Sequence, residues 1–359
     1  MSIWKYAKHW EATPLAHAVT MGEGATPLVR STRIGPALGI ENLWFKLEGT
    51  NPTGSYKDRF AAAAVAHLKM QGRELCLGTS SGNTGAALAA YCARAGLRCV
   101  LAIVEGAPEG KLRQMRAYGA ELLKIRGFGS SSAVAVSVME GLRDFAGELD
   151  AGFEISAYHF SPLGMAGVET IGIELSEFFS GDSFDVFSPA GGGGLTLAVA
   201  RGIESFGGRA RVHCVQPIGN DTMATALREG GPTLAVDSKT AISGLQVGGV
   251  LDGDAVVEIC RRMGGSGYLV ADETVWEWQA RLVREEGVFC EPAGAVALAG
   301  VARSLALGEL DVRSQVVCLV TGTAFKDERS LNRLTGEGET QMADDFTEFK
   351  KEVRKLCLV

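Results

Sequence analysis

The stretch Asn51-Pro52-Thr53-Gly54-Ser55-Tyr56-Lys57-Asp58-Arg59-Phe60 decides the fold of this chain. It follows an apolar run, residues 43–48, that predicts a strand, and precedes an Ala-rich run, residues 61–70, that predicts a helix. The proline and the glycine form a turn and Ser55 is a typical N-cap, so we expect Lys57 in the first turn of that helix. The helix dipole disfavours a charged lysine there, which favours the neutral amine that attacks an aldehyde. A lone lysine is more often a solvated surface residue, so this interpretation needs support from other motifs.

Length, charge and cysteine content narrow the class of protein. At 359 residues the chain suits two domains, and its net charge of −7 argues against nucleic acid or an anionic membrane as a partner. No apolar run is long enough to span a bilayer, and the N-terminus lacks the apolar core of a signal peptide. The eight cysteines form no Cys-x-x-Cys pair and the five histidines are isolated, so we expect buried thiols and no metal site. Together these features predict a cytoplasmic enzyme.

Short apolar runs alternate with amphipathic runs along most of the chain. One series covers residues 74–145 and a second covers residues 165–320. Such alternation predicts βαβ units with right-handed crossovers, and therefore parallel sheets in an α/β fold. Near the C-terminus, Phe346, Phe349 and Val353 stand at helical spacing, which predicts a C-terminal helix docked on the body of the protein.

A second motif, Gly78-Thr79-Ser80-Ser81-Gly82-Asn83-Thr84-Gly85, follows a predicted strand and opens a predicted helix. Small hydroxyl and amide side chains with free backbone N–H groups at such a place can hold a carboxylate or a flat polar ring. Turns between strand and helix are also rich in glycine and serine for purely conformational reasons. By itself this motif fits both interpretations.

The third motif is the glycine-rich loop Ser188-Pro189-Ala190-Gly191-Gly192-Gly193-Gly194-Leu195-Thr196. Four successive glycines leave their backbone N–H groups open at the start of a predicted helix, where a phosphate can bind. A nicotinamide-dinucleotide site would instead need Gly-x-Gly-x-x-Gly and an acidic residue at the end of the next strand, where Gln216 stands. The loop therefore favours a lone phosphate.

A fourth motif, Val320-Thr321-Gly322-Thr323-Ala324-Phe325-Lys326-Asp327, follows the last predicted strand. A threonine at a strand end can hydrogen-bond a heteroaromatic nitrogen without protonating it, although such a segment alone is more simply a turn. An activated lysine, a cradle for a ring and a carboxylate, a phosphate loop and this threonine together predict one cofactor, pyridoxal 5'-phosphate.

The four motifs resemble those of the fold type II (tryptophan synthase β-like) pyridoxal-phosphate enzymes, and within these the threonine synthases. The resemblance runs from Gly22 to Asp327, and the pattern Asn-Pro-Thr-Gly-Ser-(Phe/Tyr)-Lys-Asp-Arg is highly specific for that group. It implies that Lys57 binds the cofactor as a Schiff base and shuttles protons. The other implied contacts are with the cofactor ring hydroxyl (Asn83), the cofactor phosphate (Gly191, Gly192, Gly193 and Gly194), the ring nitrogen (Thr321) and the substrate carboxylate (Ser80, Ser81 and Thr84).

The same resemblance implies two α/β domains, with parallel or mixed sheets and with the cofactor in the cleft between them. The larger domain is expected to contain residues 1–58 and 161–359, and to bind the cofactor. Residues 59–160 are expected to form a smaller, mobile domain that closes over the substrate. The family also implies a homodimer that acts on a small amino acid.

The implied activity is that of a carbon–oxygen lyase or synthase on an amino acid with a β- or γ-leaving group, with O-phosphohomoserine and water giving threonine and phosphate. In threonine synthases an Asn-Pro-x-Arg stretch helps to bind that phosphate, whereas this chain has Ser161-Pro162-Leu163-Gly164. Lys111, Arg113 or residues 129–132 could compensate, or could be ordinary solvated residues. The missing arginine favours the alternative of β-elimination or β-replacement, as in serine/threonine dehydratases or cysteate- and cysteine-synthase-like enzymes. The intact lysine motif argues against a catalytically inactive binding module.

Overall fold

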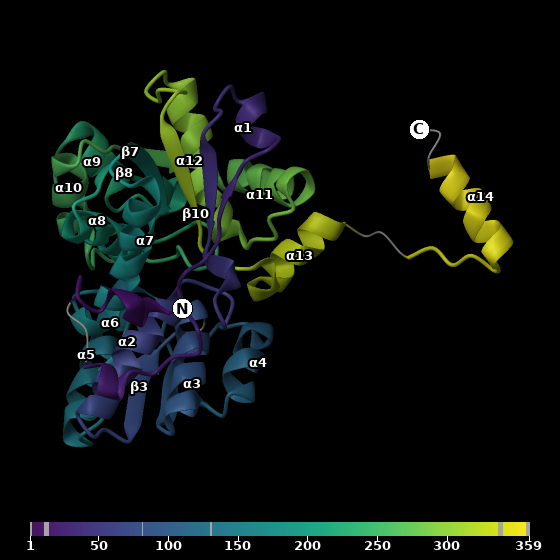
Figure 1. The fold of residues 1–359 in the computed structure, drawn as a ribbon. Helices are drawn as coiled ribbons and strands as arrows, with labels where there is room; N and C mark the ends of the chain where they lie inside the picture. The colour runs from purple at the N-terminus through teal and green to yellow at the C-terminus, as the bar shows by residue number, and fades with distance from the viewer. Residues whose placement is uncertain (1, 11–13, 81, 130, 337–339, 357–359) are drawn as a thin grey trace.

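The computed structural model describes residues 2–10, 14–80, 82–129, 131–336 and 340–356 of the chain. It contains a six-stranded sheet, in the upper half of Figure 1, and a four-stranded sheet in the lower half. Helices pack around both sheets, and all strand pairs except one are parallel. The predicted α/β class with two parallel or mixed sheets is therefore confirmed. No helix in the described part of the chain is long and apolar enough to cross a membrane.

The six-stranded sheet joins distant parts of the chain in the order β1-β2-β10-β7-β8-β9. Among the strands of the described residues only β1 and β2 pair antiparallel, at the sheet edge. The central strand β10 is apolar throughout because both of its faces are covered: Val316 and Cys318 pack in one core with α11 and α12, while Val317 and Leu319 pack in another with α7 and α8. The strands are β1 (Leu28–Arg30), β2 (Leu43–Leu47), β7 (Ser183–Pro189), β8 (Arg209–Pro217), β9 (Gly267–Val270) and β10 (Gln315–Val320).

The four-stranded sheet has the order β5-β4-β3-β6 and is entirely parallel. Its strands are β3 (Leu75–Thr79), β4 (Arg98–Val104), β5 (Glu121–Ile125) and β6 (Gly152–Glu154). All four fall inside the range 59–160, although the exact domain boundaries and the mobility of this part stay predictions. No sequence pattern predicted β6, because a strand of three residues is too short to show a period.

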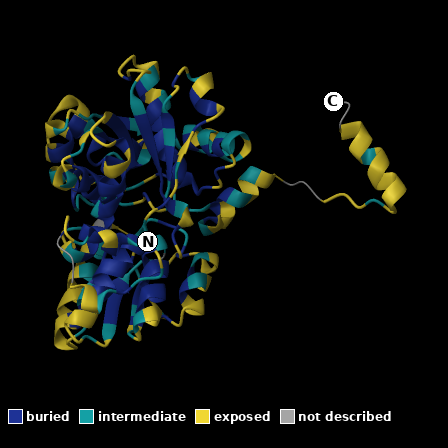
Figure 2. Ribbon diagram, viewed as in Figure 1, coloured by how far each residue is buried: buried dark blue, intermediate teal, exposed yellow. Residues whose placement is uncertain are grey.

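Helices connect the strands and cover the sheets, and the residues between them are buried in two hydrophobic clusters (Figure 2). Around the four-stranded sheet lie α2 (Lys57–Met70), α3 (Asn83–Ala95), α4 (Glu109–Ala117) and α5 (Ser132–Glu148). The remaining helices of the body are α1 (Ile34–Ala37), α6 (Pro162–Ala166), α7 (Thr170–Phe179), α8 (Gly194–Phe206), α9 (Ala224–Glu229), α10 (Gly253–Arg262), α11 (Asp272–Glu286), α12 (Pro292–Ala306) and α13 (Glu328–Thr335).

The C-terminal helix α14 (Phe346–Leu356) forms as the apolar spacing predicts, but it is not docked. Figure 1 shows it apart from the rest of the protein, and none of its residues is buried. Phe346 is 70 % exposed and Leu356 is 78 % exposed. The prediction of docking was wrong because helical spacing identifies an apolar face without identifying what covers it.

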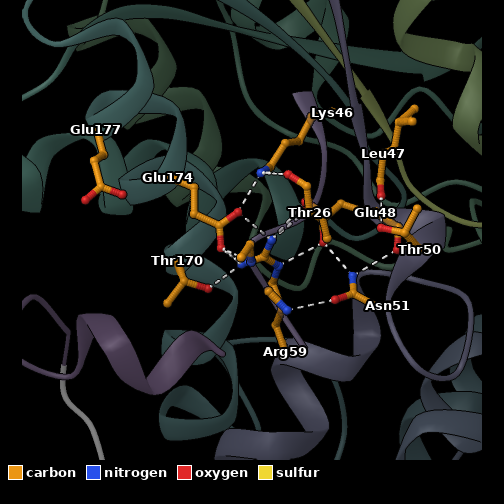
Figure 3. A network of polar contacts seen from close by, with 12 residues as sticks. Thr26, Lys46, Leu47, Glu48, Thr50, Asn51, Arg59, Thr170, Glu174 and Glu177 are labelled. Carbon is orange, nitrogen blue, oxygen red and sulfur yellow. Dashed lines mark hydrogen bonds and ion pairs between the residues drawn. The ribbon is translucent and has the colours of Figure 1, made fainter. Parts of the chain in front are cut away.

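A buried ionic network fixes the start of α2 (Figure 3). The guanidinium of Arg59 donates to both carboxylate oxygens of Glu48, at 2.8 Å each, and to both oxygens of Glu174, at 2.6 and 2.9 Å. Lys46 adds a second cation at 2.5 Å from Glu174, so two cations face two anions. All four side chains are buried, and the two positive charges balance the two negative ones. The network ties α2 to β2 and α7.

Candidate active site

Lys57 is the first residue of α2, with Tyr56 rather than Ser55 in the N-cap position. Ser55 still supports the turn, because its Oγ accepts a hydrogen bond from the Lys57 backbone N–H at 3.3 Å. The turn is also bound to the loop after β10: the Tyr56 N–H donates to the Thr321 carbonyl at 3.0 Å, and Ser55 forms a β-bridge with Gly322. The first and fourth sequence motifs therefore meet.

The amine of Lys57 contacts Ser156, which was not among the predicted site residues. Lys57 Nζ donates to Ser156 Oγ at 2.5 Å, and this Oγ lies 3.2 Å from Oγ1 of Thr84. Ser156 follows β6, which pairs with β3, so the loops after both strands reach the same end of the parallel sheet. The only sequence signal for Ser156 is its place just after a strand, and that strand is too short to predict.

Asn83 and Thr321 both contact the carboxylate of Glu291. Asn83 Nδ2 donates to the two oxygens at 2.9 and 3.2 Å, and Thr321 Oγ1 donates to Oε1 at 3.4 Å. Asn83 opens α3, beside the four-stranded sheet, whereas Glu291 is the N-cap residue of α12 and Thr321 follows β10, both in the six-stranded part. The structure thus brings two of the predicted ring-binding residues together at the junction of the two parts.

Glu291 is a buried carboxylate with an altered acidity. Burial raises its pKa to about 7, while the hydrogen bond from Asn83 and the charges of Lys326 and Lys111 act in the opposite direction. Near neutral pH this group can hold or release a proton between Asn83 and Thr321. Glu291 was not among the predicted site residues, because its importance appears only when Asn83, which is distant in sequence, is brought to it.

The glycine loop between β7 and α8 is buried and tightly enclosed. A Cβ atom on Gly191 would lie 3.2 Å from Val247, and one on Gly194 would lie 3.1 Å from Oδ2 of Asp252 and 3.4 Å from the Ser156 carbonyl oxygen. Gly193 has a φ of 97°, which side chains rarely adopt. In the described part of the chain, no group accepts a hydrogen bond from the N–H groups of Gly191–Gly194. The loop is therefore an open set of donors beside the Lys57–Ser156 contact.

The predicted substrate-binding residues are only partly described. Thr84 lies beside Ser156, as above. The Ser80 Oγ accepts a hydrogen bond from the Gly82 N–H at 3.1 Å, which closes a tight turn before α3. Ser81 lies outside the described residues. Both hydroxyl groups therefore lie at the N-terminal end of α3, and that of Thr84 is connected to Lys57 through Ser156.

Comparison with known proteins decides the family. The sequence pattern of the family described as "Pyridoxal-phosphate dependent enzyme" matches residues 19–322, most of the chain. The chain belongs to the pyridoxal-phosphate dependent enzyme family. It is therefore an enzyme whose cofactor is pyridoxal phosphate, as the four motifs predict.

Curated threonine synthases are similar in sequence to this chain over most of its length. A threonine synthase of Methanocaldococcus jannaschii is 29 % identical over 347 residues, which are 94 % of this chain and 84 % of that protein. A threonine synthase of Halalkalibacterium halodurans is 33 % identical over 320 residues, which are 88 % of this chain and 86 % of that protein. The similarity therefore includes both sheets and all four motifs.

Solved structures share the fold of this chain. A threonine deaminase isoform of Solanum lycopersicum superposes with a TM-score of 0.74 at 22 % identity, covering 93 % of this chain and 92 % of that one. The diaminopropionate ammonia lyase of Escherichia coli gives a TM-score of 0.76 at 17 % identity, covering 94 % and 93 %. The predicted fold type II architecture is confirmed, and at such identities the likeness concerns the fold alone.

Proposed function

We propose that the predicted residues hold pyridoxal phosphate between the two parts of the molecule. The open N–H groups of Gly191–Gly194 suit its phosphate, because they stand at the N-terminus of α8. Lys57 would bind its aldehyde carbon, and Asn83 and Thr321 would contact its ring hydroxyl and ring nitrogen. The shared partner of these last two is Glu291, which can be present there as a carboxylate or as a carboxylic acid because burial raises its pKa to about 7.

The remaining residues of the site would act on the amino-acid substrate. Pyridoxal phosphate, when bound, withdraws electrons from the substrate Cα and acidifies its C–H bond. The amine of Lys57 would take up that proton, and Ser156 would orient the amine through its short hydrogen bond. Ser80 and Thr84, with Ser81, would bind the substrate carboxylate. The hydroxyl of Thr321 is neutral, which favours elimination and replacement over transamination.

The reaction we propose is that of a threonine synthase: O-phosphohomoserine and water give threonine and inorganic phosphate. Net atoms balance, because the C–O bond to phosphate breaks with its electron pair leaving on phosphate, and water supplies the hydroxyl and the proton of threonine. The observation that carries this proposal is the identity of 29–33 % with threonine synthases over 88–94 % of the chain. The catalytic lysine motif lies inside the matched region.

One observation favours a second candidate, a β-eliminating or β-replacing enzyme. Gly164 occupies the place of the phosphate-binding arginine of threonine synthases, and a Cβ there would lie 2.7 Å from the Phe60 ring and 3.0 Å from the Ala64 Cβ. No side chain fits without rearranging this buried contact, so an arginine could not act from this position. A substrate without a phosphate would need no replacement for it.

The domain movement and the assembly belong to the same proposal. We infer that residues 59–160, which contain the four-stranded sheet, close over the substrate as a smaller domain. The homodimer and the cytoplasmic location stay predictions from the sequence. Sedimentation of the purified holoenzyme would measure the assembly directly.

The deciding experiment is an assay of the purified holoenzyme with O-phospho-L-homoserine, in which threonine and inorganic phosphate are measured together. We expect equal amounts of both products, and none from Lys57→Ala, which should also lack the yellow absorbance of a bound cofactor. L-serine, L-threonine and O-phospho-L-serine are assayed in parallel for ammonia and keto acid. A yellow enzyme that turns over only these three would refute the threonine synthase reaction and support the second candidate.

A further inference from the structure

Lys111 and Lys326 face the junction of the two parts from opposite sides. Lys111 lies on α4, beside the four-stranded sheet, and Lys326 ends the 3₁₀ turn η6 (Ala324–Lys326) that follows β10. We propose that these two lysines form an anion-binding subsite for the phosphate that leaves the substrate. The inference rests on the proposed function, and it answers what replaces the arginine that Gly164 excludes.

Lys111 reaches across the junction toward the six-stranded part. Its Nζ donates to the hydroxyl of Ser243 and lies 4.0 Å from Oδ2 of Asp327. Ser243 precedes Gly244, whose carbonyl oxygen would be 3.3 Å from a Cβ on Gly191. The ammonium group of Lys111 is thus near the phosphate loop, with a neutral hydroxyl as its close partner and a carboxylate only at the limit of an ion pair.

Lys326 contacts α4, the helix that carries Lys111, from the six-stranded part. Its Nζ donates to Oε1 of Gln114, on α4, at 2.7 Å, and the amide nitrogen of Gln114 donates to the Thr53 carbonyl at 3.2 Å. Among the described residues no carboxylate lies within ion-pair distance of Lys326. Burial lowers the pKa of Lys326, against the charges of Glu291 and Asp58. A partly buried cation with a neutral close partner is a place where an anion stabilises the protein.

A cavity of about 430 Å³ opens beside Lys326. Its walls come from the turn that precedes Lys57, from α4 and from the loop after β10, and they include Thr53, Gln114, Thr323 and Lys326. The Cε of Lys326 would lie 3.2 Å from a Cβ on Gly54, three residues before the catalytic lysine. A phosphate group fits the volume, and its oxygens could accept from Lys326 and from the hydroxyl and amide groups of the walls.

Both lysines also act on the catalytic centre. Each favours the charged form of Glu291, the group between Asn83 and Thr321. They therefore lie within electrostatic reach of the wall where the cofactor ring would bind. When the bond from carbon to oxygen breaks, negative charge develops on the departing phosphate, and two fixed ammonium groups beside it would lower the barrier.

The other candidates from the sequence are less well placed. Arg113 lies on α4 but is exposed, whereas Lys111 on the same helix is only 23 % exposed. Ser131, within residues 129–132, is exposed and its hydroxyl caps α5 by accepting from the Val134 N–H at 3.3 Å. Arg113 is therefore a suitable control: it carries the same charge on the same helix but faces solvent.

The test compares Lys111→Gln, Lys326→Gln and Arg113→Gln with the wild-type holoenzyme. KM and kcat are measured for O-phospho-L-homoserine and for O-acetyl-L-homoserine. The acetyl ester of the second substrate is neutral, whereas the phosphate ester of the first is an anion. We expect each lysine variant to raise KM for the phosphate ester about tenfold, the effect of losing one charge-assisted hydrogen bond. Arg113→Gln should leave both constants unchanged, and Lys111→Arg should restore most of the loss. Equal losses with both substrates, or no loss with either, would overturn the subsite.

A second measurement keeps this inference separate from the proposed reaction. Inorganic phosphate is titrated into the holoenzyme, saturated with pyridoxal phosphate so that the glycine loop is filled, and the shift in melting temperature is recorded. The wild type and Arg113→Gln should show the same shift, and the lysine variants should need about tenfold more phosphate for it. If the wild type does not turn over O-phospho-L-homoserine, the proposed threonine synthase reaction is refuted. The phosphate titration then tests the anion-binding subsite by itself, and equal shifts in melting temperature in all variants would refute that subsite.

Discussion

Arg59 and Glu174 form a bidentate ion pair inside the protein, with Nη1–Oε1 at 2.6 Å and Nη2–Oε2 at 2.9 Å. Arg59 belongs to α2 and Glu174 to α7, so the pair joins the helix that begins with Lys57 to the six-stranded part. The guanidinium also donates to the Thr170 hydroxyl at 2.8 Å. The catalytic lysine is thus held two residues from a rigid, fully paired buried cation.

Removing the positive charge of Arg59 should lower the free energy of unfolding. Arg59→Met leaves two buried carboxylates with only Lys46 to balance them, and breaking a buried pair in this way typically costs about 3–5 kcal/mol. We expect a loss of this size in the free energy of unfolding of the apoenzyme in urea. The matched control is Lys5→Met, which removes an exposed ion pair to Glu177 on the same helix α7 and should cost less than about 1 kcal/mol. Similar losses in both variants would contradict the argument.

Ser156 should affect the rate more than the stability. Ser156→Ala removes the partner of the Lys57 amine, which becomes charged when it takes up the substrate proton, and one hydrogen bond to a charged group contributes about 1.5–3 kcal/mol. We expect kcat to fall by about 10- to 100-fold while the absorbance of the bound cofactor persists. Ser156→Thr, which keeps the hydroxyl, should recover part of the rate. Unchanged kcat in the alanine variant would show that the contact does not orient the amine during turnover.

Gly193→Ala should weaken cofactor binding specifically. Its φ of 97° disfavours any side chain, and the new Cβ would lie 2.9 Å from Val256. We expect the Kd of the apoenzyme for pyridoxal phosphate to rise at least about tenfold, because the donor loop must shift. Gly207, at the other end of α8, has a φ of 77° and open space around it. Gly207→Ala should lower stability by about 1–2 kcal/mol and leave that Kd unchanged.

Glu154 should make the protein less stable at higher pH. Burial raises its pKa to about 7 from 4.5, and its Oε2 has no hydrogen-bond partner among the described residues. Between these pH values the folded state binds a proton that the unfolded state has lost, so stability falls as pH rises from about 5 to 7. Glu154→Gln should match the wild type at pH 5 and be more stable by up to about 3 kcal/mol at pH 8.

Urea titrations at the two pH values measure this difference. Glu148→Gln is the control, because Glu148 is an exposed residue of α5 near the same sheet. It should show the same small effect at both pH values. A constant difference between Glu154→Gln and the wild type would refute the role of protonation.

Local chemistry explains why much of the site could be predicted from the sequence. The turn before Lys57 and the glycines before α8 determine their own backbone conformations, and both place their residues at helix N-termini as predicted. The apolar run of β10 likewise predicts a strand that is covered on both faces.

The missed residues depend on contacts that no local pattern encodes. Glu291 becomes important only through Asn83, which lies 208 positions away in the sequence. Ser156 is isolated and follows a three-residue strand. The separation of α14 from the body could not be predicted either, because an amphipathic pattern shows which face is apolar but not whether another surface covers it.

The exposed helix α14 supports the last prediction. Truncation after Gly336 removes a segment with no buried residue among those described, so the melting temperature of the body should not change. Truncation after Lys326 is the contrasting variant, since it also removes α13, whose buried Ser330 accepts a hydrogen bond from Gln279 at 3.2 Å. That shorter chain should melt several degrees lower. Calorimetry at two protein concentrations checks both results: if loss of α14 lowered the melting temperature only at the higher concentration, the helix would be stabilising an assembly of chains rather than the body of one chain.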